Sequence, residues 1–121
     1  DPPLNTVEVE KNGEGIFLED GVHWKTSKYT NIPNGNYTLG FRAHHLKLSS
    51  TKNDDLKLAG EVLVTELSGS ESFVHLKVNV NNWVVHTHGI YNFREEEQIG
   101  MFLSLSNCYL FDTEGDRVYA K

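Results

Sequence analysis

Hydrophobic and polar residues alternate along much of this chain with the two-residue period of β-strands that have one buried face. The cleanest alternation runs from Ser72 to Val80, where a valine or leucine falls at every second position. The segment Leu56–Leu67 is instead apolar on both faces, which is typical of a strand with neighbours on both sides. We predict a turn at Asn81-Asn82, because asparagine accepts the left-handed backbone of tight hairpins, followed by a return strand over 83–89. The inward side of the alternating run is predicted to comprise Val74, Leu76, Val78 and Val80.

Further short strands are predicted between turn signals rich in Gly, Asn, Asp and Pro. They cover residues 6–10, 16–18, 22–24, 37–42, 99–105, 109–111 and 117–119. A helical turn fits at Ala43–Leu46. Roughly nine or ten short strands with almost no helix predict an all-β fold, an OB-fold-like small barrel with short additional strands and at most one or two helical turns. At 121 residues we expect one domain, 1–121.

Acidic residues outnumber basic ones, with 17 Asp and Glu against 11 Lys and Arg and a formal net charge of −6. Binding to nucleic acid or to an anionic membrane surface draws on clustered Lys and Arg, so we expect neither partner. No apolar run approaches the roughly 20 residues that a transmembrane helix needs, so direct membrane insertion is not expected. Cys108 is the single cysteine, which excludes an internal disulfide and fits a reducing cytoplasm.

The motifs of nucleotide binding and of common nucleophilic catalysis are missing from the sequence. There is no Gly-x-x-x-x-Gly-Lys-Ser/Thr loop to hold phosphates and no Gly-x-Ser-x-Gly elbow. Cys108 lies among apolar residues, where a thiol is usually inert. We therefore expect no catalytic residue, no metal and no cofactor in this chain.

Histidines offer a weaker chemical signal. His86 and His88 are two residues apart on a predicted strand, so both rings project from the same face. With His75 as a third ligand they would form the site of a small metal-dependent enzyme. The simpler interpretation is an exposed strand face that carries His and Thr.

Four motifs follow one another in this sequence and resemble a known family. They are Asp1-Pro2-Pro3-Leu4-Asn5, then Leu39-Gly40-Phe41-Arg42-Ala43-His44-His45-Leu46, then Gly60-Glu61-Val62 continuing to Glu66-Leu67-Ser68-Gly69-Ser70-Glu71-Ser72-Phe73-Val74-His75, and Leu110-Phe111-Asp112-Thr113-Glu114-Gly115. In this order they resemble the C-terminal regulatory domain, of the transport-associated OB (TOBE) and molybdate-binding-like kind, of ABC transporter ATP-binding subunits that import sugars or glycerol-3-phosphate. The resemblance covers essentially the whole chain. Ala43-His44 and Ser106-Asn107-Cys108 depart from the family pattern, which has proline at both places.

The resemblance implies a role and a set of partners. Such a domain is regulatory and helps to hold two ATPase subunits together, so the implied partners are a second copy of the parent subunit, membrane permease subunits and a regulatory protein. ATP and Mg would belong to a missing domain ahead of Asp1, and the complex would lie in the cytoplasm at the inner membrane. Candidate interface or regulatory residues, matched to family positions near loops, are Gly35, Gly60, Glu66, Ser68, Gly69, Ser70 and Glu71.

A small-ligand sensor is the alternative interpretation of the same segment. Ser68, Ser70 and nearby backbone amides would act as donors to an oxyanion or a sugar. No Lys or Arg adjoins this loop, which weakens the case for an oxyanion.

Overall fold

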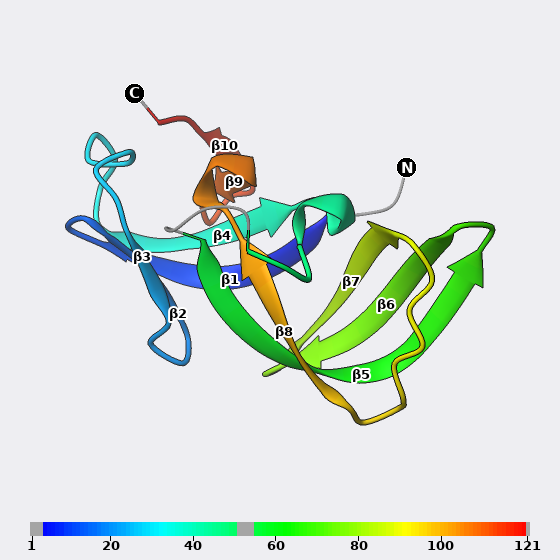
Figure 1. Cartoon of the computed structure of the whole chain (residues 1–121). Coiled ribbons are helices and arrows are strands. Elements are labelled where there is room, and N and C mark those ends of the chain that lie inside the picture. The colour runs from blue at the N-terminus through cyan, green and yellow to red at the C-terminus, as the bar shows by residue number, and fades with distance from the viewer. Residues whose placement is uncertain (1–3, 51–54, 121) are drawn as a thin grey trace. The chain divides into compact units, whose positions relative to one another are not determined.

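The chain is all-β in the part that the computed structural model describes, residues 4–50 and 55–120. This confirms the predicted fold class (Figure 1). The Asp-Pro-Pro opening of the first motif lies outside the described residues. The strands are β1 (Asn5–Asn12), β2 (Gly15–Leu18), β3 (His23–Lys25), β4 (Gly35–Phe41), β5 (Leu56–Ser68), β6 (Glu71–Val78), β7 (Asn81–His88), β8 (Gln98–Leu103), β9 (Cys108–Phe111) and β10 (Arg117–Val118).

Two compact units divide the chain, and each contains one sheet. The first unit comprises the described residues of 1–5 and 41–107 and holds the sheet β7-β6-β5-β8. The second unit comprises 6–40 and the described residues of 108–121 and holds the sheet β10-β9-β4-β1-β2-β3. The prediction of one domain over 1–121 stays a prediction.

In the second unit, β1 alternates buried and exposed residues along its whole length. Its last buried position is Lys11, whose ammonium donates to the carbonyl of Ile32 at 3.0 Å and to Oδ1 of Asn34 at 3.1 Å. The amide of Gly13 also donates to Asn34 Oδ1, at 2.9 Å. A buried ammonium is costly unless its donors are satisfied, and these bonds hold the segment before β4 against the end of β1.

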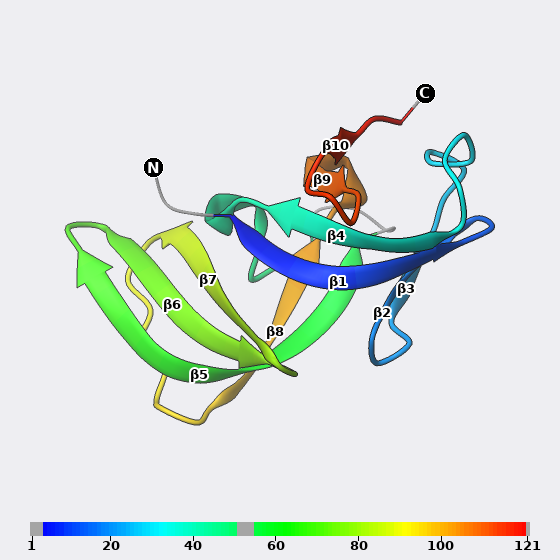
Figure 2. The ribbon, with the colours of Figure 1, turned by 180° about the vertical axis from the view of Figure 1, so that it is seen from behind.

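In the first unit, β5 is the long central strand, paired with β6 on one side and β8 on the other. It curves strongly along its length (Figures 1 and 2). The pairing with β6 contains a β-bulge, since Val62 lies opposite Leu76 but Val64 lies opposite His75. The sequence prediction that this strand has neighbours on both sides is confirmed for the strand as a whole, since residues 56–61 pair with β8 and residues 61–68 pair with β6.

The alternating run forms β6, and its buried positions are largely those predicted. Val74, Leu76 and Val78 are buried, whereas Val80 is 79% exposed. The predicted turn at Asn81-Asn82 is wrong, because these residues begin β7 and Val78 pairs with Asn81. The loop is Asn79-Val80, and Asn79 takes the left-handed backbone with a φ of 55°. The correct residue type thus makes the turn, two positions earlier than predicted.

Two single turns of 3₁₀ helix complete the first unit, within the predicted limit. The turn Ala43–His45 lies where a helical turn was predicted, and the His45 amide donates to the Arg42 carbonyl at 3.0 Å. The second turn, Leu105–Asn107, ends the last strand of the sheet two residues earlier than the sequence predicted. Ala43 and Leu105 are the buried members of the two turns.

Gly60 is required by a close approach within the sheet. A Cβ at this position would lie 2.9 Å from Val78 Cγ2, 3.1 Å from Met101 Cε and 3.2 Å from the carbonyl oxygen of Lys77. We predict that Gly60→Ala lowers the free energy of unfolding by about 1–3 kcal/mol, because these neighbours must move. Urea denaturation followed by circular dichroism measures the change.

Gly100→Ala is the matched control on the adjacent strand β8. The nearest atom to a Cβ there is the Leu58 carbonyl oxygen at 3.9 Å, which is ordinary contact. This variant is expected to stay within about 0.5 kcal/mol of the parent. Equal losses in the two variants would contradict the packing explanation for Gly60.

Candidate functional site

One face of the first unit's sheet carries polar and titratable side chains from three neighbouring strands. The register places Glu66, Phe73 and His86 in one row across β5, β6 and β7, and Val64, His75 and Val84 in the next. Residues directly opposite on antiparallel strands share a face. We call this surface the polar face; its rows are Ser68–Glu71–His88, Glu66–Phe73–His86, Val64–His75–Val84 and Glu61–Lys77–Asn82.

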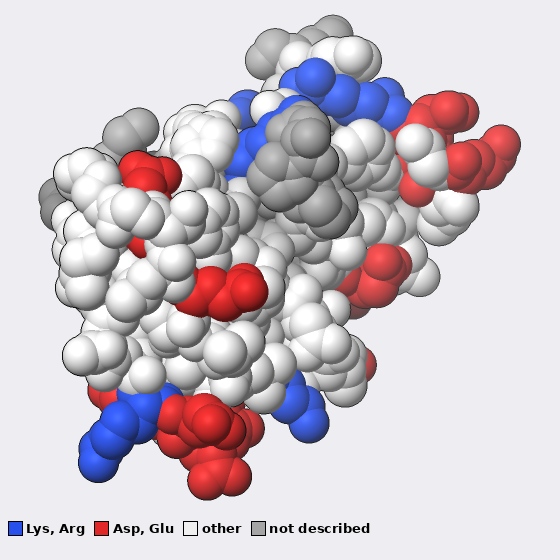
Figure 3. Space-filling view, turned by 90° about the vertical axis from the view of Figure 1, so that its right-hand side faces the viewer, with Lys and Arg blue, Asp and Glu red and all other residues white. Residues whose placement is uncertain are grey.

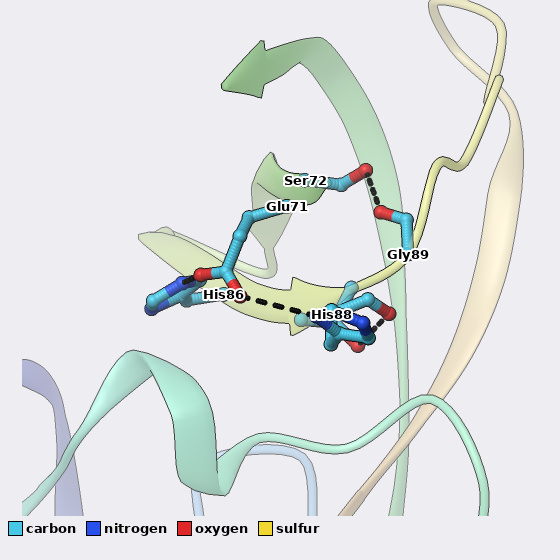
Figure 4. Close-up of polar contacts among 6 residues, drawn as sticks. Glu71, Ser72, His86, His88 and Gly89 are labelled. Carbon is cyan, nitrogen blue, oxygen red and sulfur yellow. Dashed lines mark hydrogen bonds and ion pairs between the residues drawn. The ribbon is translucent and has the colours of Figure 1, made fainter. Parts of the chain in front are cut away.

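Glu71 holds two histidines of β7 at one end of the polar face (Figure 4). One carboxylate oxygen bonds Nε2 of His86, and the other lies 3.3 Å from Nδ1 of His88. The hydrogen bond to His86, and then that to His88, lowers the pKa of the Glu71 carboxyl below its ordinary value. Glu71 therefore links the beginning of β6 to the last residues of β7 through side-chain hydrogen bonds.

Ser72 anchors the segment that follows β7. Its hydroxyl donates to the carbonyl of Gly89 at 2.7 Å and accepts from the amide of Tyr91 at 3.1 Å. Figure 4 shows Ser72 extending away from Glu71 toward Gly89. Neighbouring residues of β6 thus fix both β7 itself and the chain that leaves it.

A second carboxylate–histidine contact lies further along the polar face. Glu66 Oε1 is 2.6 Å from His75 Nε2, which joins β5 to β6. Between the two carboxylates, the Phe73 and His86 rings stack with centroids 4.4 Å apart and an interplanar angle of 15°. The arrangement couples three strands through side chains as well as through the backbone.

A pocket of about 380 Å³ opens beside these residues, entirely within the first unit. Asn5 forms part of the pocket wall and is itself buried. Its side chain bonds the backbone of β7 in the way that a neighbouring strand would. Asn5 Nδ2 donates to the Val84 carbonyl and Asn5 Oδ1 accepts from the Val84 amide, both at 2.9 Å. The lining residues are Leu4, Asn5, Ala43, Glu66, Phe73, His75, Asn82, Val84 and His86.

The sequence-predicted candidates are only partly brought together. Glu66, Ser68, Gly69, Ser70 and Glu71 all lie at the β5–β6 hairpin, where Gly69 has a φ of 62°. Gly60 lies further back in β5, and Gly35 belongs to the second unit. Of these, Glu66 alone lines the pocket. Their role in contacts or regulation stays a prediction.

Sequence reasoning missed the pocket because its walls come from separate segments. The sequence gives no sign that Asn5 caps the edge of β7. His75 and His86 were considered as metal ligands, with an exposed strand face as the simpler interpretation. Their ring nitrogens instead bond carboxylates, and the described residues contain no group of three or more His, Cys, Asp and Glu side chains that could hold a metal ion.

Cys108 is buried, and burial raises the pKa of its thiol to about 12. The thiolate, which is the reactive form, is therefore scarce at neutral pH. Among the described residues, no helix has the length and hydrophobicity that a membrane crossing requires.

Together, the fold and the polar face define a small all-β protein in which carboxylate–histidine pairs border a pocket. No protein-family model matches the chain. The chain is 27% identical over 122 residues to the sn-glycerol-3-phosphate import ATP-binding protein UgpC of Chromohalobacter salexigens. This match covers 97% of the chain but spans only 32% of the length of that relative. The resemblance to importer ATP-binding subunits that the sequence motifs indicate is confirmed.

The fold is similar to that of a solved OB-type domain. The cytoplasmic molybdate-binding protein ModG, crystallised with molybdate bound, matches with a TM-score of 0.61 over 88% of this chain and 94% of its own. At 14% sequence identity the likeness concerns the fold. The predicted OB-fold-like class is thereby confirmed.

The hydrogen bonds of Glu71 to His86 and His88 predict that the stability of the fold decreases in acid. The native pKa of Glu71 lies below its ordinary value of 4.5, so the ionised carboxylate stabilises the native state above pH 4.5. That stabilisation is lost as the pH falls through the lowered native pKa. Glu71→Gln should therefore lower the urea midpoint at pH 6 and have a smaller effect in acid. Glu95→Gln, at an exposed position, is the control. An equal effect of Glu71→Gln at both pH values would contradict the assignment.

Burial of Cys108 predicts slow alkylation. In native buffer at pH 8 we expect iodoacetamide to label Cys108 far more slowly than it labels the urea-unfolded chain, because the native thiol is both protonated and shielded. Mass spectrometry measures the labelled fraction. Equal rates in the two states would show that the thiol is accessible.

Proposed function

We propose that this chain is a regulatory domain of the ATP-binding subunit of a bacterial ABC importer for sugars or related small solutes, and that it carries out no catalysis itself. The observation that carries the proposal is the match to an import ATP-binding protein along nearly the whole chain. The OB-like fold and the lack of a phosphate-binding loop support it.

The proposal assigns the chemistry to a domain outside this chain. ATP and Mg would bind that nucleotide-binding domain, permease subunits would contact it, and the complex would lie in the cytoplasm at the inner membrane. The present chain would contribute contacts between two copies of the parent subunit, and its surface would receive any regulatory protein. Such a role needs stable strands and an accessible contact surface rather than a nucleophile.

The outer edge of β5 supports a contact role. Beyond Val62, no strand in the described part of the chain pairs with this edge. Leu63, Val64 and Leu67 are 42%, 48% and 51% exposed along the same stretch. An open strand edge with exposed apolar side chains favours pairing with another chain. Figure 3, seen from the side on which the tips of β5 and β6 lie in Figure 1, shows a broad area of mostly uncharged atoms with isolated acidic groups, while Lys, Arg and further acidic groups lie toward its upper and lower margins.

A concentration series of NMR spectra on the 121-residue chain tests the contact. We expect amide shifts of residues 63–68 to change with protein concentration, and Leu67→Lys to suppress the change by placing a charge on the edge. Val80→Lys is the matched control, because Val80 is exposed in a different hairpin. Amide shifts that do not depend on protein concentration would contradict a contact at this edge. So would a concentration dependence that Leu67→Lys and Val80→Lys suppress equally.

A second candidate function is suggested by the fold shared with a molybdate-binding protein. In this alternative, Ser68, Ser70 and backbone amides of the β5–β6 hairpin hold an oxyanion or a sugar. The hairpin holds Glu66 and Glu71 and no Lys or Arg, so its charge opposes an anion. Calorimetric titration with molybdate, sulfate and sugars is expected to give no heat, and a saturable heat would favour this alternative.

A further inference from the structure

The pocket on the polar face combines an apolar wall with a few polar groups. Phe73, Val84, Leu4 and Ala43 supply the apolar wall. Glu66, His75, His86 and Asn82 supply the polar groups. Ligand sites in proteins commonly have this composition, and about 380 Å³ lies within their usual range of volumes. The pocket therefore has the size and lining for a small organic molecule.

The charge around the pocket selects the ligand class. Glu66 is the one acidic side chain among the described residues that line the pocket. Glu71 lies next to the pocket through its bond to His86. The polar face carries three carboxylates, Glu61, Glu66 and Glu71, against one ammonium, Lys77. No Lys or Arg lines the pocket, and an anion would meet repulsion there.

We propose that this pocket binds a small organic cation, a primary ammonium on a short apolar body. The ammonium donates to the Glu66 carboxylate, whose side chain is 64% exposed and which retains a second oxygen besides the one bonded to His75. The apolar body contacts Phe73 and Val84. A charge-assisted bond to a carboxylate is stronger than a neutral one, so Glu66 contributes most of the selectivity. The adjoining aromatic ring favours a cation further.

This site shares Glu66 with the stretch 63–68 of the strand edge, but the rest of its lining belongs to neither that edge nor the hairpin amides of the proposed function. Binding is measured on the chain itself, without any ATPase partner. Failure of the ligand proposal would therefore leave the regulatory role standing, and failure of the regulatory role would leave the pocket unchanged.

The test is an NMR titration of the 121-residue chain with three probes of matched size. n-Butylammonium chloride is the cation, 1-butanol the neutral analogue and sodium butyrate the anion. We expect n-butylammonium to shift the resonances of Phe73, His75, Val84 and His86 in a saturable manner. Butanol should bind about tenfold more weakly because it lacks the charge, and butyrate should not bind.

Glu66→Gln keeps the shape of the side chain and removes its charge. It should weaken n-butylammonium binding about tenfold and leave butanol binding unchanged. Glu95→Gln, at an exposed position outside the pocket lining, is the control for net charge and should bind like the parent. Spectra without ligand verify that both variants are folded. Equal affinity for butanol and n-butylammonium, an unchanged affinity in Glu66→Gln, or the absence of saturable shifts would each overturn the proposal.

Discussion

One extra residue in β5 determines which side chains reach the polar face. Without the bulge, Val64 and Glu66 would share the buried face of Val62, because residues two apart on a regular strand point the same way. The bulge brings Val64 opposite His75 and Glu66 opposite Phe73. The Glu66–His75 pair and the pocket both depend on this shift. The two ends of β5 therefore have different partners, β8 along residues 56–61 and β6 along residues 61–68.

The rest of the site follows from the regular pairing of β6 with β7. Val74 and Val85 are buried on one face, so Phe73 and His86 must lie on the other. Glu71 then meets His86 and His88, and Asn5 closes the outer edge of β7 at Val84. These contacts hold the side chains in place through rigid strands rather than through a mobile loop. Such a surface suits binding and contact functions, which need a fixed shape more than a reactive group.

The sequence predicted the elements that depend on local pattern. The central position of β5 and the buried side of β6 were both correct, because apolar residues mark them directly. The turn after β6 was misplaced because Asn79, Asn81 and Asn82 all tolerate a left-handed backbone, and only strand register selects among them. The pocket was not predicted, because the bulge moves the Glu66 side chain to the opposite face of the sheet. No local sequence pattern reveals the bulge. His75 and His86 carried a recognisable signal, but their carboxylate partners come from other strands.

The central claim is that this chain is the non-catalytic regulatory part of an importer's ATP-binding subunit. The most direct measurement is the nucleotide sequence of the coding region ahead of the Asp1 codon. The claim predicts a continuous reading frame that encodes a Gly-x-x-x-x-Gly-Lys-Ser/Thr loop, the phosphate-binding element of such subunits. A reading frame that begins close to Asp1, or one that lacks this loop, would contradict it.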